Sequence, residues 1–205
     1  MSLKNSKKYK EAMLKYDFAK KKIETELDIL MEEHEFKTGY NPVEHTKSRI
    51  KTYESIVEKL ESKKLDITVD NMIKYINDLV GIRIICTFLE EVYEIANIIK
   101  SSKEFIVCDD ADYIKEPKAS GYSSYHIDIL VPVNLKEARE YVKVEIQIRT
   151  VAMDTWATFD HKLRYKLPNK IPKEVKEEMQ KRAIEVMELD KRMQKINELI
   201  KKYAD

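Results

Sequence analysis

Residues 141–150 read Tyr-Val-Lys-Val-Glu-Ile-Gln-Ile-Arg-Thr, an alternation of polar and apolar side chains without a break. A period of two predicts a β-strand with one face against a core and the other face polar. The polar face carries Glu145, Gln147 and Arg149 in a row. That face is either the solvent side of an antiparallel sheet or one wall of a site. The remaining chain decides between the two interpretations.

The composition is that of a globular protein with a heavily charged surface. The 205 residues are 43% hydrophobic and 37% charged, with a net charge of only +1. A protein that mainly coats nucleic acid is usually far more basic. Without an apolar run of membrane-spanning length or a signal-peptide core, we expect a cytoplasmic protein without membrane contact. Cys86 and Cys108 lie in apolar, strand-like stretches and are expected to be reduced core residues.

Helix and strand signals occur along the whole chain. Helical spacing predicts helices over 4–35, from Pro42 onward, and over 71–78, 90–100, 151–167 and a last stretch to about 203, with breaks at Pro168 and Pro172. Apolar or alternating runs predict strands over 82–88, 105–107, 124–131 and 141–150. The pattern is α+β: a mixed β-sheet of four or five strands, flanked by helices and with helical extensions at both ends.

Two acids and several cations are candidates for a site. Asp78 precedes a predicted strand and Glu145 lies in the middle of another. Two carboxylates that a sheet brings together can hold Mg²⁺, which takes its other ligands from water and phosphate. With only three glycines and no G-x-x-x-x-G-K-[ST] loop, the chain would hold phosphates through side chains. Arg83 lies inside an apolar strand and needs a partner or a ligand.

Other candidates have an ordinary structural interpretation beside the functional one. Tyr122, next to Gly121, either stacks on a base or packs in the protein. His126 is either a ligand or a surface histidine with its hydrogen bonds satisfied. Ser55 and Lys59 share one face of a predicted helix, and basic faces of this kind are usually solvated.

Several ordered segments together resemble one known family. They are Asn-Pro-Val-Glu and Ser-Arg-Ile-Lys within 41–51, Ile-Asn-Asp-Leu-Val-Gly-Ile-Arg-Ile at 76–84, the run from Asp112 to His126, and Val-Glu-Ile-Gln-Ile-Arg-Thr at 144–150, continued by 156–166. On these motifs the chain resembles the small alarmone synthetases, stand-alone relatives of the RelA/SpoT synthetase domain that make (p)ppGpp.

The resemblance implies a nucleotidyltransferase-like sheet that transfers the β,γ-pyrophosphate of ATP to the 3′-hydroxyl of GDP or GTP and releases AMP, in the stringent response. No His-Asp pair of the family's hydrolase domain is present, so we expect synthesis without hydrolysis. The implied organisation is an N-terminal helical extension (1–40), a synthetase domain (41–170) and a C-terminal helix for oligomerisation (171–205). Family resemblance also suggests a homotetramer and single-stranded RNA as a partner.

Roles for individual residues follow from the motifs. Arg49 and Arg83 would sandwich the adenine, because a flat guanidinium stacks on a base as an ammonium cannot. The phosphates of ATP would be held by Lys51, Ser55, Lys59 and His126. The guanosine substrate would be placed by Tyr122, Lys118, Gln147 and Lys115. Mg²⁺ would be held by Asp78 and Glu145, and Glu145 would bind the metal or take the proton from the 3′-hydroxyl.

Two alternatives stay open at this point. One is a catalytically silent or weakly active RNA-binding oligomer on the same fold, against which the intact pair of Asp78 and Glu145 argues. The other is a nucleotidyltransferase with another acceptor. The stretch Asp109-Asp110-Ala111, where relatives often carry basic residues, leaves the choice between GDP and GTP open.

Overall fold

The computed structural model describes residues 3–135, 138–166 and 171–204, and it contains one mixed five-stranded sheet. The strand order is β1-β2-β5-β4-β3, with β2 and β5 parallel and the other neighbours antiparallel. The strands are β1 (His45–Ile50), β2 (Val80–Cys86), β3 (Ile106–Asp112), β4 (Tyr125–Asn134) and β5 (Arg139–Thr150). This sheet, flanked by helices, confirms the predicted α+β class.

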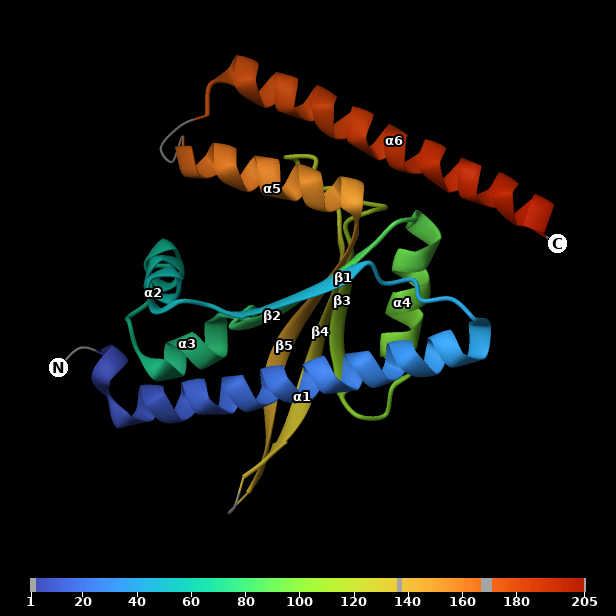
Figure 1. Cartoon of the computed structure of the whole chain (residues 1–205). Coiled ribbons are helices and arrows are strands. Elements are labelled where there is room, and N and C mark those ends of the chain that lie inside the picture. Colours follow the sequence, from blue (N-terminus) through green and yellow to red (C-terminus); the bar gives the residue numbers. More distant parts are fainter. Residues whose placement is uncertain (1–2, 136–137, 167–170, 205) are drawn as a thin grey trace.

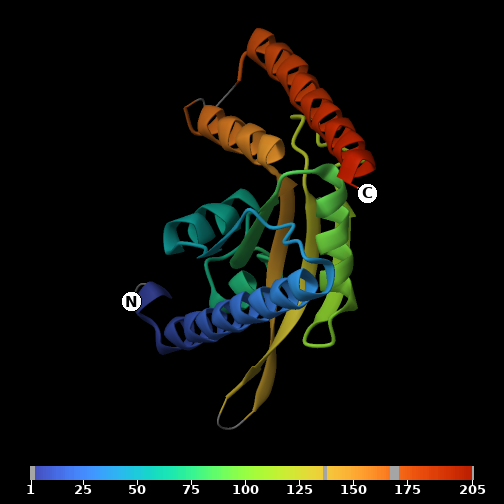
Figure 2. The ribbon, with the colours of Figure 1, turned by 45° about the vertical axis from the view of Figure 1, so that its right-hand side comes forward.

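The helices divide between one face of the sheet and one end of it (Figure 1). After a short 3₁₀ turn at Leu3–Asn5, they are α1 (Lys7–Thr38), α2 (Tyr53–Ser62), α3 (Val69–Tyr75), α4 (Leu89–Ser101), α5 (Val151–Lys166) and α6 (Lys173–Ala204). Figure 2 shows α1 and α4 beside the sheet, with α5 and α6 beyond its end. None of these helices is long and apolar enough to cross a bilayer in the described part of the chain.

The main core lies between the sheet and the helices α1 and α4. Val144, Ile146 and Ile148 of β5 are fully buried on this side, as their alternation predicted. Apolar residues spaced by three and four along α1, from Tyr9 to Met31, complete the same cluster. The opposite face of β5 is not covered by α1 or α4, and it carries the polar side chains.

The helix predicted to begin near Pro42 is wrong. Residues 45–50 form the edge strand β1, antiparallel to β2, and a helix starts only at Tyr53. Thr52 marks that start, because its hydroxyl accepts a hydrogen bond from the Ser55 amide. An edge strand that is mostly exposed needs no apolar alternation, so β1 carries no strand signal of its own. The apolar residues that were assigned to one helix belong partly to β1 and partly to α2.

Two expectations about the strand β3 also need correction. It extends over Ile106–Asp112 and so includes the acidic stretch that was predicted to follow it. Cys86 is buried as expected, but Cys108 is exposed rather than in the core. The pairing register shifts between Val107 and Asp109 on this edge strand, and the bulge turns Cys108 away from the core.

The last two helices form a separate small cluster. Trp156 of α5 packs with Met179 and Ala183 of α6, and all three are buried. Near its C-terminal end α6 also contacts α4, where Lys201 forms an ion pair with Glu90 at 2.6 Å. The break predicted at Pro168 and residues 136–137 of the predicted β4–β5 connection lie outside the described residues.

Candidate active site

The polar face of β5 aligns with polar residues of both neighbouring strands. On parallel β2, Gly81 is opposite Glu145 and Arg83 is opposite Gln147. On antiparallel β4, His126 is opposite the same Gln147. Residues directly opposite each other in a sheet project to one side, so these side chains share a face. Because α1 and α4 cover the other face, this one is free to form a site.

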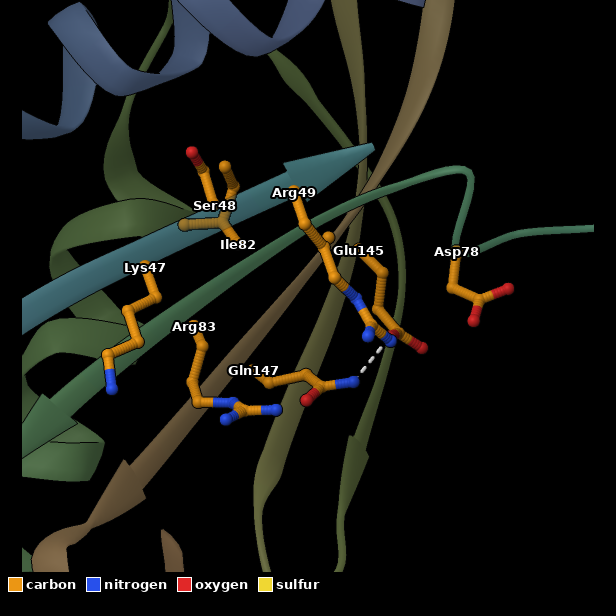
Figure 3. Close-up of a pocket in the computed structure, with 9 residues that line it drawn as sticks. Lys47, Ser48, Arg49, Asp78, Ile82, Arg83, Glu145 and Gln147 are labelled. Carbon is orange, nitrogen blue, oxygen red and sulfur yellow. Dashed lines mark hydrogen bonds between the residues drawn. The ribbon is translucent and has the colours of Figure 1, made fainter. Parts of the chain in front are cut away.

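A cavity of ≈ 340 Å³ opens on this polar face (Figure 3). Its lining comes from β1, β2, β5 and the residue that leads into β2: Lys47, Ser48, Arg49, Asp78, Gly81, Ile82, Arg83, Glu145 and Gln147. Figure 3 shows Arg49 and Arg83 reaching into it beside Gln147 and Glu145. The two acids that are 67 positions apart in the chain, Asp78 and Glu145, therefore line one cavity, as the sequence hypothesis requires.

Two further cavities adjoin the first on the same face. One of ≈ 390 Å³ shares Arg49, Arg83 and Gln147 and extends to Tyr122 and the helix α5. The other, of ≈ 190 Å³, shares Glu145 and extends past His126 to β3. Glu145 thus lies between the first and third cavities, and Gln147 lies between the first and second. This leaves room for two ligands, one on each side of the pair.

Asp78 is held by two lysines, Lys51 just before α2 and Lys59 in the last turn of α2. Its two carboxylate oxygens lie 2.6 Å from Lys51 Nζ and 2.6 Å from Lys59 Nζ. Burial by itself raises the pKa of Asp78, but the two ammonium groups outweigh it and lower the pKa to about 2. Ser55 lies in the first turn of α2, where its hydroxyl accepts a hydrogen bond from the Thr52 hydroxyl at 3.1 Å. Asp78 is therefore ionised throughout the neutral range.

Glu145 is partly buried among polar partners. Gln147 Nε2 donates a hydrogen bond to Glu145 Oε2 at 2.5 Å, and His126 Nδ1 lies 3.4 Å from Oε1. Burial raises the pKa of Glu145, whereas His126 and then Gln147 lower it, and the net shift is downward. An ionised carboxylate in this place can bind a cation or accept a proton.

Arg149 closes a ring of hydrogen bonds around the site. Its Nη2 donates to Tyr122 Oη at 2.5 Å and to Gln147 Oε1 at 2.6 Å. Tyr122 Oη lies 2.8 Å from His126 Nε2, and His126 returns to Glu145. The strand alternation predicted that Arg149 lies on the polar face, but no binding or catalytic role was predicted for it. Its burial, with only 3% of the residue exposed, comes from tertiary packing that strand alternation does not report.

The turn before β4 presents Tyr122, and α6 packs on that turn. Gly121 has φ +78°, and a Cβ there would lie 2.1 Å from the Ala183 Cβ. Lys118 Nζ lies 5.1 Å from the centre of the Tyr122 ring. Lys115 pairs with Asp112 at 3.1 Å, and neither Lys115 nor Lys118 lines any of the three cavities.

Arg83 has a protein partner and still faces the cavity. Its Nη1 lies 3.1 Å from Asp154 Oδ1 on α5, and its side chain is 32% exposed. Its Nε is buried without a hydrogen-bond partner in the described structure. The carboxylate engages one end of the guanidinium, and the exposed remainder is turned to the cavity that Arg49 lines from the neighbouring strand.

Asp78 and Glu145 are the candidate ligands for a metal ion. Within the described residues, no group of three or more His, Cys, Asp or Glu side chains could hold one. Mg²⁺ needs no such group, because it commonly binds through one or two carboxylates together with phosphate oxygens and water. Asp78 and Glu145 fit that requirement, provided that the lysines on Asp78 turn to the phosphates. The residues therefore suit a magnesium ion that arrives with a nucleotide.

Comparison with known proteins places the chain in a family. The family model described as "Region found in RelA / SpoT proteins" matches residues 48–170. The chain belongs to the RelA/SpoT family. The motifs in residues 41–166 had identified this family, and the match confirms it.

Individual relatives of this RelA/SpoT-family chain match over nearly its whole length. GTP pyrophosphokinase YwaC of Bacillus subtilis is 44% identical over 185 residues, which are 90% of this chain and 88% of that protein. The structure of small alarmone synthetase 1 from Bacillus subtilis bound to its product pppGpp has a TM-score of 0.87 at 32% identity, covering 95% of this chain and 99% of that one. The same synthetase bound to AMPCPP has a TM-score of 0.78 at 30% identity, covering 96% and 100%.

Proposed function

We propose that this chain is a (p)ppGpp synthetase, a GTP pyrophosphokinase of the stringent response. It transfers the β,γ-pyrophosphate of ATP to the 3′-hydroxyl of GDP or GTP and releases AMP. The observation that carries the proposal is the shared cavity of Asp78 and Glu145, with Arg49 and Arg83 on its wall, in a chain of this family. Relatives named as GTP pyrophosphokinases and as small alarmone synthetases support the same reaction.

ATP binds on the β1–β2 side of the site. Arg49 and Arg83 take the adenine between their guanidinium planes. Lys51 and Lys59 exchange Asp78 for phosphate oxygens when the triphosphate enters, so that neither lysine is left without an anion. Ser55, in the first turn of α2, and His126, on β4 in the adjoining cavity, complete the phosphate contacts.

Asp78 and Glu145 would hold Mg²⁺ together with the phosphates. When bound, the ion would supply positive charge that offsets the charge of the transferred group. The two carboxylates have lowered pKa values, so both are ionised and able to bind it at neutral pH. Pyrophosphoryl transfer needs placement and charge neutralisation more than covalent help, which fits a site built from cations and acids.

The guanosine nucleotide binds on the β4–β5 side. Tyr122 stacks on the guanine, and Lys118, which lies beside that ring, contributes positive charge; Lys115 reaches the same nucleotide from further along the loop. Gln147 positions the ribose, and Glu145 takes the proton from the 3′-hydroxyl. A positioned general base typically contributes about 10²- to 10⁴-fold to a rate.

Assembly and location complete the proposal. Apolar side chains remain exposed along α6, including Ile196 at 57% and Tyr203 at 90%, and a homotetramer would cover them. Single-stranded RNA is a further partner that the resemblance suggests. We place the enzyme in the cytoplasm, where both nucleotide substrates are abundant.

One assay tests the reaction. The chain is incubated with Mg²⁺, labelled ATP and either GDP or GTP, and the products are separated. We expect AMP and a 3′-pyrophosphorylated guanosine nucleotide. Glu145→Gln removes the base and keeps the shape, so synthesis falls by about 10²-fold or more while an unreactive ATP analogue still binds. Glu140→Gln is the matched control, since Glu140 lies on the same strand and pairs with Lys15 at 2.7 Å.

The alternatives give different results. Transfer to another acceptor with none to GDP or GTP would favour a different nucleotidyltransferase. RNA binding without any nucleotide product would favour the silent oligomer. Full activity in Glu145→Gln would remove that carboxylate from the mechanism.

A further inference from the structure

One carboxylate oxygen of Asp154 is shared by two arginines. Asp154 Oδ1 lies 3.1 Å from Arg83 Nη1 and 3.1 Å from Arg149 Nη1. The Asp154 side chain is 17% exposed and that of Arg149 only 4%, so the contact is shielded from solvent. Shielded ion pairs are stronger and less screened by salt than surface pairs. The shared oxygen therefore links the two guanidinium groups firmly.

The fold places Asp154 there without an intervening loop. Helix α5 begins at Val151, directly after β5 ends at Thr150, so Asp154 lies in the first turn. Thr150 Oγ1 accepts a hydrogen bond from the Met153 amide at 3.1 Å, which fixes that turn. A carboxylate is stabilised in the first turn of a helix by the positive end of the helix dipole.

The two arginines both line the cavity that extends to Tyr122, but each also contacts a different part of the site. Arg83 lines the cavity where ATP is proposed to bind. Arg149 binds Tyr122 and Gln147, and Gln147 in turn donates to Glu145. Asp154 is thus the junction between the adenine clamp and the network that presents the guanine platform and the base.

We propose that Asp154 is a positioning residue that couples the two nucleotide subsites, an inference that rests on the proposed function. Stacking of adenine on Arg83 holds that guanidinium still, and with it the Asp154 carboxylate. Arg149 is then held in the orientation that bonds both Tyr122 and Gln147 before the guanosine nucleotide arrives. Coupling of this kind is reciprocal, so a bound guanosine nucleotide also tightens the binding of ATP.

Binding of AMPCPP with and without GDP tests the coupling. The methylene of AMPCPP replaces the oxygen between the α- and β-phosphates, where transfer cleaves ATP, so binding is measured without reaction. In the wild type we expect AMPCPP to bind at least about fivefold tighter when GDP is saturating. In Asp154→Asn, which keeps the shape and removes the charge, that ratio falls to within about twofold of unity. Asp70→Asn, a surface aspartate paired with Lys8 at 2.7 Å, is the control and keeps the wild-type ratio.

The outcomes separate this inference from the function on which it rests. A wild-type ratio of one, or an unchanged ratio in Asp154→Asn, overturns the coupling even if the wild type makes (p)ppGpp. A wild type that neither binds AMPCPP nor makes product defeats the proposed function instead, and the coupling falls with it. If Asp154→Asn loses its folded circular dichroism spectrum, Asp154→Glu decides the matter. That variant keeps the charge and moves it by one methylene, so a reduced ratio supports the coupling and a wild-type ratio overturns it.

Discussion

Asp190 of α6 is a buried acid that should make the stability of the protein fall as the pH rises. It is 2% exposed, and its Oδ2 accepts a hydrogen bond from Thr150 Oγ1 at 2.6 Å. Its Oδ1 is buried without a hydrogen-bond partner in the described structure. Burial raises the pKa of Asp190 from 3.8 to about 6, and the Thr150 hydrogen bond only partly opposes that shift. The folded state therefore holds a proton that the unfolded state releases.

The size of the effect follows from the shift. A difference of about two pKa units corresponds to about 3 kcal/mol at 1.36 kcal/mol per unit. Between pH 3.8 and about 6 the folded chain binds more protons at this residue than the unfolded chain, so the free energy of unfolding decreases with rising pH. Above about pH 6 the full penalty of burying an ionised carboxylate remains. In Asp190→Asn this contribution is absent at every pH.

Urea unfolding at fixed protein concentration, from pH 4 to pH 8, measures the difference. The amide keeps an acceptor for Thr150, and any cost of its own burial is independent of pH. We therefore expect the free energy of unfolding of Asp190→Asn, relative to the wild type, to rise by about 2 kcal/mol between pH 4 and pH 8, because part of the ~3 kcal/mol is already lost at pH 4. Asp17→Asn, an exposed aspartate paired with Lys21, is the control. Parallel pH curves for wild type and Asp190→Asn would refute the argument.

Three further substitutions test the site. Asp78→Asn should abolish magnesium-dependent synthesis, and at neutral pH it should cost about 2 kcal/mol of stability. In the wild type this stabilisation is present above pH 3.8 and disappears as the pH falls through about 2. Acid unfolding of both proteins measures the difference. Gly121→Ala should raise the KM for GDP or GTP more than that for ATP, because φ is +78° and the new Cβ meets Ala183; steady-state kinetics with Ala183→Gly added should show partial recovery. Arg83→Lys should weaken AMPCPP binding by about 3- to 30-fold in calorimetry, since an ammonium stacks poorly, and unchanged affinity would contradict the adenine clamp.

The strand that carries Glu145 could be predicted because one alternation places apolar side chains in the core and polar side chains on the opposite face. Val144 and Ile146 must face the core, so Glu145 and Gln147 must face the other way. The edge strand β1 could not be found in this way. Both of its faces are largely solvated, and its residues, His-Thr-Lys-Ser-Arg-Ile, follow no apolar period. A better signal was available in Thr52, a good N-cap three residues before Ser55, which marks where the next helix begins.

The site residues also divide into those that the sequence could predict and those that it could not. Motif resemblance named Asp78, Glu145 and the clamp arginines, and the structure brings these together at one cavity. Motif resemblance could not predict the ion pair of Arg83 with Asp154. That contact depends on the direction in which α5 leaves the sheet, which the spacing of residues along the chain does not report.

The parallel pairing of β2 with β5 explains why so few glycines suffice for a phosphate-binding enzyme. It puts Arg83 opposite Gln147 and Gly81 opposite Glu145, so residues on two central strands meet on one face. The same cavity is lined by Asp78, whose carboxylate pairs with Lys51 and Lys59, the two lysines that we propose for the phosphates. A backbone cradle binds phosphate through fixed amides and needs glycine for close approach, whereas this arrangement binds through side chains that carry their own counter-ion. In the proposed mechanism, entry of a triphosphate would exchange one ion pair for another, and the freed Asp78 would then be able to hold a metal ion.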